Sequence, residues 1–150
     1  MMFVRYRAVP ALVRARRPDL ELVVAGAKPD GVDRPGVTLL GYVPMEDLVR
    51  LHRGASVFSY PSLYEGFGMP IVEAMASGTP VVASSHPSLD EASGGAAVRV
   101  DPESPDAIAD GIERALVEQE TLILAGLEHA RRFTWRACGE AHLHGFRTAS

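Results

Sequence analysis

The feature that most constrains the fold is a glycine loop between an apolar run and a short helix. Gly66 and Gly68 allow backbone to approach a ligand closely, and residues 57–58 suit a buried strand. Pro70 suits a first helical position because its missing N–H would have no intrahelical partner there. Gly78 and the proline after it end this helix, and a second apolar run follows.

A strand, a glycine loop and a helix N-terminus predict an anion site, because free N–H groups and the positive end of the helix dipole point at one spot. Glu65 lies before the loop and Glu73 lies one turn inside the helix. A carboxylate beside a phosphate is repelled unless it accepts from neutral donors, such as sugar hydroxyls. The predicted ligand is therefore a nucleotide-sugar. The alternative is a glycine turn with two solvated glutamates on an ordinary α/β crossover.

The stretches 65–70, 73–76 and 78–82 resemble the signature of the family-four retaining glycosyltransferases. This resemblance implies that Glu65 is the catalytic residue, which meets the transferred sugar. It also implies that Glu73 binds the ribose hydroxyls of a UDP- or GDP-sugar that donates a hexose.

The same resemblance implies that loop amides hold the sugar and phosphate of the donor. The implied donor-binding residues of the loop are Phe67, Gly68, Met69 and Pro70. A Gly-x-Val turn before a helix also resembles the family, so backbone groups around Val43 are expected against the nucleobase. Family members manage without an Asp-x-Asp metal site, and none is present here, so we expect no bound metal and no cofactor besides the donor.

The composition and the net charge indicate which class of protein this is. At 150 residues, with 47% hydrophobic and 23% charged residues, the chain is expected to be one soluble domain spanning 1–150. A net charge of −4 argues against nucleic acid as a partner. No apolar run approaches the roughly 18 residues of a membrane span. Residues 1–18 carry arginines where a signal peptide needs its apolar region, so we expect a cytoplasmic protein.

Single residues allow further expectations. Cys138 is the only cysteine, which excludes an internal disulfide and favours a small buried residue. His52 is expected at the boundary of a helical apolar face rather than in catalysis. Ser88 is a candidate cap for a short turn. His142 and His144 have no third ligand at suitable spacing, which favours surface histidines over a metal site.

Strands that alternate with helices predict an α/β fold with a Rossmann-like, doubly wound parallel sheet, whose crevice lies at the carboxyl ends of the strands. Strands are expected at residues 20–26, 37–40, 56–60, 81–83 and 97–100. Helices are expected over 1–17, from 45, from 70, from 105, over 121–132, and after a cap at Thr134.

The resemblance covers only the second of the two Rossmann-like domains of a GT-B enzyme. The expected partner is therefore an N-terminal acceptor domain or another chain. The family's first strand, with the Arg and Lys that neutralise the diphosphate, has no match, and Lys28 follows a different strand. This favours the alternative of a truncated, non-catalytic module that binds a nucleotide or a partner. A third hypothesis is a sugar-nucleotide epimerase of the same two-domain fold.

The unmatched strand would be the central one, between the strands at 20–26 and 56–60. A buried strand edge without a partner lowers the stability of the fold, by roughly 1 to 3 kcal/mol for each unpaired backbone group. We therefore expect these two strands to pair with each other or with another chain. A strand from residues 1–8 would also fill the place.

Overall fold

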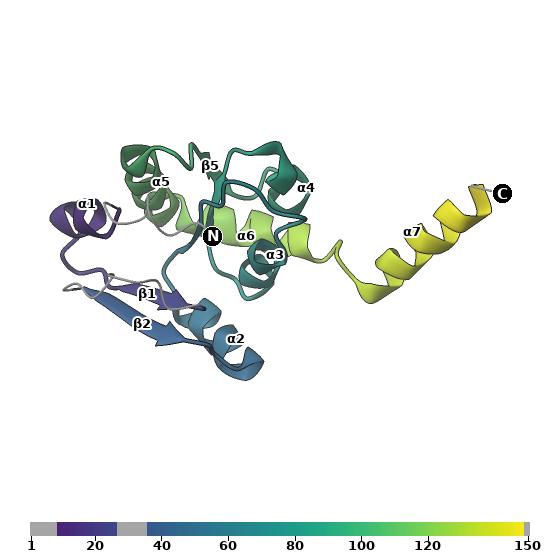
Figure 1. Ribbon diagram of the computed structural model, residues 1–150, viewed down its shortest axis with the longest axis horizontal. Coiled ribbons are helices and arrows are strands. Elements are labelled where there is room, and N and C mark those ends of the chain that lie inside the picture. The colour runs from purple at the N-terminus through teal and green to yellow at the C-terminus, as the bar shows by residue number, and fades with distance from the viewer. Residues whose placement is uncertain (1–8, 27–35, 149–150) are drawn as a thin grey trace.

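The computed structural model describes residues 9–26 and 36–148, and it confirms the alternation of strands and helices (Figure 1). The strands are β1 (Leu22–Ala25), β2 (Val37–Gly41), β3 (Phe58–Tyr60), β4 (Val81–Ser84) and β5 (Val98–Val100). The helices are α1 (Val9–Arg16), α2 (Met45–Gly54), α3 (Met69–Ala76), α4 (Asp90–Ser93), α5 (Pro105–Val117), α6 (Gln119–Ala130) and α7 (Trp135–Thr148).

The strands form two parallel sheets instead of one continuous sheet. β1 pairs with β2, and the other three strands lie in the order β3-β4-β5. Direct pairing of β1 with β3 is therefore wrong for the residues described. α1 packs on α5, and α2 packs on α3. Pairing with another chain stays a prediction, and a strand from residues 1–8 lies outside the described residues.

The core lies on both faces of the three-stranded sheet. β4 is buried along its whole length, as its apolar sequence predicts. Successive side chains of a strand point to opposite faces, so Val81 and Ala83 join a cluster with α3, while Val82 joins a second cluster with α5. The sheet is covered on both sides, which is the doubly wound arrangement expected from the sequence.

Two predicted helix caps are confirmed and one is wrong. Ser104 Oγ accepts a hydrogen bond from the N–H of Ala107 at 3.2 Å, and Thr134 Oγ1 accepts one from the third residue after it at 3.1 Å. Ser88 is not the cap of its short turn. His86 has extended backbone at the start of that turn, and its Nδ1 accepts from the N–H of Ser88 at 3.1 Å.

The C-terminal helix α7 projects away from the other elements (Figure 1), and none of its residues is buried. The expectation that Cys138 is buried is therefore wrong, because no other element covers that helix. His142 and His144 are exposed, as expected of surface histidines. Among the described helices, none is both long and apolar enough to cross a membrane.

Candidate functional site

The glycine loop places Gly68 at the N-cap of α3. Its φ of 95° lies in the left-handed region, which residues other than glycine rarely adopt. A Cβ on Gly68 would also lie 2.6 Å from Cδ2 of Leu89. Among the described residues, no side chain caps α3. Pro70 has no N–H, and the N–H of Ile71 donates to the carbonyl of Gly68 at 2.9 Å, so the N–H groups available to an anion are those of Gly68 and Met69.

Glu65 is held in one orientation before the helix begins. Its Oε1 accepts hydrogen bonds from the hydroxyl of Tyr60 at 2.8 Å and from Oγ of Ser62 at 2.7 Å. Burial raises the pKa of the Tyr60 hydroxyl, and the hydrogen bond to Glu65 raises it further. The Tyr60 hydroxyl therefore keeps its proton and remains a hydrogen-bond donor to this carboxylate across the physiological pH range.

Glu73 lies on the face of α3 that is turned toward α2. It lines a hollow of about 200 Å³ between the two helices. The other residues that line the hollow are Met45, Leu48, Val49, His52, Ala76 and Ser77. The lining is mostly apolar, so it offers the Glu73 carboxylate few hydrogen-bond donors. A ligand with hydroxyl groups would supply such donors.

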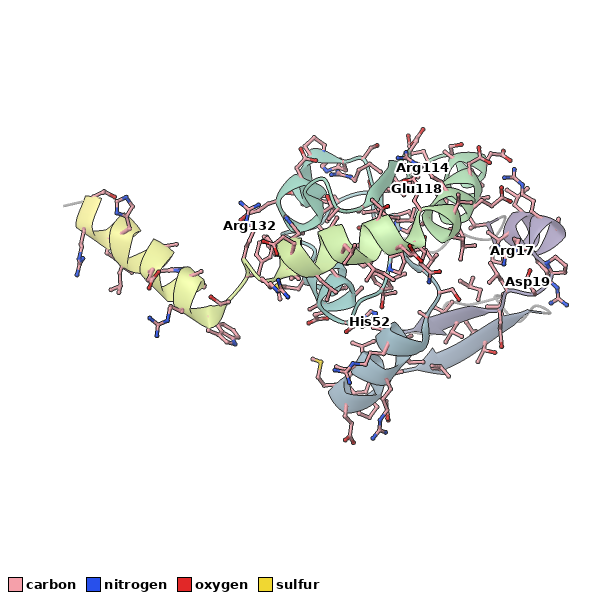
Figure 2. All side chains as sticks on the ribbon, turned by 180° about the vertical axis from the view of Figure 1, so that it is seen from behind. Arg17, Asp19, His52, Arg114, Glu118 and Arg132 are labelled. Carbon is pink, nitrogen blue, oxygen red and sulfur yellow. The ribbon has the colours of Figure 1, made fainter. Side chains whose placement is uncertain are left out.

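His52 is 4% exposed, so its expected place at a boundary is wrong. Its ring contacts Phe58 edge to face, with 4.9 Å between centroids, and its carbonyl accepts from Oγ1 of Thr79 at 2.6 Å. Burial lowers the pKa of His52, and attraction to the Glu73 carboxylate opposes this effect. Nε2 is buried without a hydrogen-bond partner among the described residues. His52, labelled in Figure 2, is thus a neutral core residue.

The remaining predicted residues lie in three places. Gly68, Met69 and Pro70 form the start of α3, and Met69 is 51% exposed. The ring of Phe67 packs on Phe133 with 5.6 Å between centroids, so its side chain belongs to the core cluster. Val43 lies two residues before α2 and is not among the residues that line the hollow.

Sequence reasoning missed the residues that orient Glu65. Tyr60 and Ser62 stand five and three residues before it, at and just after the end of the half-buried strand β3, so their polar groups were a usable signal. Ser88 also contributes, because its Oγ accepts from the N–H of Glu65 at 3.2 Å. The two are 23 residues apart, and no local pattern connects them.

Comparison with known proteins identifies the family of the chain. Residues 3–118 match the family model described as Glycosyl transferases group 1. The O-antigen chain mannosyltransferase B of Escherichia coli is 37% identical over 153 residues, which cover 95% of this chain and 40% of that protein. The D-inositol 3-phosphate glycosyltransferase of Corynebacterium glutamicum (strain R) is 41% identical over 63% of this chain and 24% of its own length.

Solved structures show the same fold. The sucrose-phosphate synthase of Thermosynechococcus elongatus is similar over 99% of this chain and 44% of its own, with a TM-score of 0.71 and 28% identity. Anabaena HepE, solved in complex with UDP and glucose, is similar over 95% of this chain and 45% of its own, with a TM-score of 0.77 and 19% identity.

The chain spans less than half the length of each of these four proteins. The family model nevertheless covers more than half of the chain, and the match extends through the glycine loop and both glutamates. The chain therefore belongs to the Glycosyl transferases group 1 family and has the fold of one half of a GT-B glycosyltransferase.

Proposed function

We propose that this chain is the donor-binding half of a retaining glycosyltransferase that transfers a hexose from a UDP- or GDP-sugar. The observation that carries the proposal is the fixed Glu65 carboxylate three residues before Gly68, the N-cap of α3. A sugar diphosphate needs both an acceptor for its hydroxyls and donors for its phosphate.

In this proposal the start of α3 receives the diphosphate. The N–H groups of Gly68 and Met69 and the helix dipole stabilise the charge that grows on the leaving group as the sugar departs. Glu65 orients the sugar through its hydroxyls. Phe67 contributes through its backbone, because its ring lies in the core cluster.

The nucleoside would lie toward α2. Glu73 accepts from the ribose hydroxyls at the rim of the hollow, and backbone groups around Val43 meet the nucleobase. Anabaena HepE was solved with UDP and glucose, which supports a nucleotide-sugar as the ligand class. An N-terminal acceptor domain or another chain would supply the acceptor, because this chain spans less than half of its relatives.

Calorimetric titration with UDP, GDP, UDP-glucose and GDP-mannose tests the proposal. Glu73→Ala is expected to weaken binding of the preferred nucleotide about tenfold to a hundredfold, because it removes the partner of buried hydroxyls. Glu128→Ala is the matched control, since that glutamate is exposed on α6. Equal binding by the Glu73 variant and the parent would refute the ribose role.

The proposal extends to a cytoplasmic enzyme that works without a metal ion. The N–H groups of α3 supply the positive potential that a metal would otherwise provide. Donor affinity is therefore expected to be the same with EDTA and with added Mg²⁺, and a loss of affinity in EDTA would contradict this part.

The second candidate is a module that binds a nucleotide or partner without transfer. Assaying sugar release from UDP-glucose by the chain, with and without the acceptor half of a relative, separates the two. Donor binding that never leads to sugar release or transfer would favour the module.

A further inference from the structure

Arg99, in the middle of β5, makes the largest set of side-chain hydrogen bonds among the described residues. Its guanidinium donates to the carbonyl of Ser84 at 2.6 Å, to Oγ of Ser93 at 2.7 Å, to Oδ1 of Asp90 at 2.8 Å and to the carbonyl of His86 at 3.0 Å. All four acceptors belong to the segment 84–93, which links β4 to the end of α4. The Arg99 side chain is only 23% exposed, so water replaces these bonds poorly.

The segment 84–93 in turn contacts the Glu65 loop at three points. Oγ of Ser88 accepts from the N–H of Glu65 at 3.2 Å and lies 2.9 Å from Nδ1 of His86. The ring of His86 contacts that of Tyr64, with 5.5 Å between centroids. Leu89 is fully buried against Gly68, where it occupies the space that a Cβ would need.

We infer that Arg99 is a positioning residue for the glycine loop, acting through the segment 84–93. By fixing the carbonyls of Ser84 and His86, it sets where Ser88 meets the N–H of Glu65. Arg99 makes no hydrogen bond to Glu65 in the structure described, so its effect reaches the loop through the intervening segment. The consequence for donor binding rests on the function proposed above.

A lysine in the same place would not replace it. The four bonds leave from Nε, Nη1 and Nη2, which point in different directions in the guanidinium plane. An ammonium group is a single point charge and reaches fewer of these acceptors at once. Arg99→Lys therefore keeps the charge and removes the geometry.

Amide hydrogen exchange, followed by NMR on the free 150-residue chain, tests the link without any nucleotide. Arg99→Lys and Ser88→Ala should each speed exchange at the Glu65 N–H about tenfold or more, while the amides of α5 stay as in the parent. Arg114→Lys is the matched control, because Arg114 pairs with Glu118 on an exposed face of α5 (Figure 2). Unchanged exchange at Glu65 in Arg99→Lys would overturn the inference, even if Ser88→Ala speeds that exchange.

If Arg99→Lys does not fold, Ser88→Ala still tests whether the segment 84–93 positions the loop. This variant removes the hydrogen bond between Ser88 and Glu65 without changing β5. The affinities for UDP-glucose and UDP then give the effect on the donor. Both variants should lower the ratio of UDP-glucose affinity to UDP affinity by about fivefold, whereas a general loss of stability would weaken both ligands alike. An unchanged ratio in a chain that binds UDP would overturn the role in donor positioning. A parent that binds neither nucleotide would refute the proposed function, while exchange at Glu65 would still decide the link.

Discussion

The hydroxyl of Tyr60 donates a hydrogen bond of 2.8 Å to Oε1 of Glu65 across the end of β3. Ser62 donates to the same oxygen at 2.7 Å, so two neutral donors fix the carboxylate before any ligand arrives. Groups that are already oriented lose less freedom when a ligand binds. The bond from Tyr60 is therefore part of how the site would hold a sugar.

Tyr60→Phe is expected to weaken UDP-sugar binding while leaving UDP binding almost unchanged. The variant removes one donor to a charged group, so the expected loss is about 1 kcal/mol, or roughly fivefold in affinity. Calorimetric titration with both ligands measures it. Tyr64→Phe is the control, because Tyr64 is 73% exposed, and the hydroxyl that donates to Glu65 is that of Tyr60. An equal loss for UDP and UDP-sugar would contradict the role of Glu65 at the sugar.

The two loop glycines should respond differently to alanine. Gly68→Ala forces a side chain into a left-handed φ of 95° and against Leu89, so we expect a loss of stability of roughly 1 to 3 kcal/mol. Gly66→Ala meets no atom within 4 Å, so we expect a change within about 0.5 kcal/mol. Urea unfolding measures both free energies. Equal losses in the two variants would show that the tight packing at Gly68 does not matter.

His52 should make the fold sensitive to mild acid. Its pKa is lowered by burial, so the unfolded chain takes up the proton first as the pH falls through 6.5. Stability is then lost below that pH, with a slope of at most about 1.4 kcal/mol per pH unit from this one group. Urea unfolding between pH 8 and 5 measures the slope. His52→Leu should flatten it.

His144→Ala is the control for this series, because that histidine is exposed on α7. It should leave the slope unchanged. The only carboxylate that acts on His52 in the described residues is Glu73, which opposes the effect of burial. If His52→Leu kept the full acid sensitivity of the parent, the loss would have to come from other groups.

Patterns within one element predicted structure well. The apolar run at β4 is buried throughout, and Ser104 caps α5, because both features depend on neighbours in the sequence. The spacing of Glu65 and Glu73 around a glycine loop likewise identified the family that the comparisons support.

Features set by distant contacts were not predictable in this way. The burial of His52 depends on Phe58 and on the fit of α2 against α3, which no local pattern encodes. The cap on residues 87–89 comes from His86, a residue type that seldom has this role, so Ser88 was the better guess from sequence. The split into two sheets is set by which strands pair, and no pattern within one strand encodes its partner.

The most direct test of the central claim is an NMR titration of the ¹⁵N-labelled chain with UDP. If the start of α3 holds the diphosphate, the largest amide shifts should occur at Gly68 and Met69, with smaller shifts near Glu73 and Val43. Amides of α5 and α7 should not move. Saturating UDP that shifts no amide of the glycine loop, or shifts only amides elsewhere, would contradict a donor site at this helix.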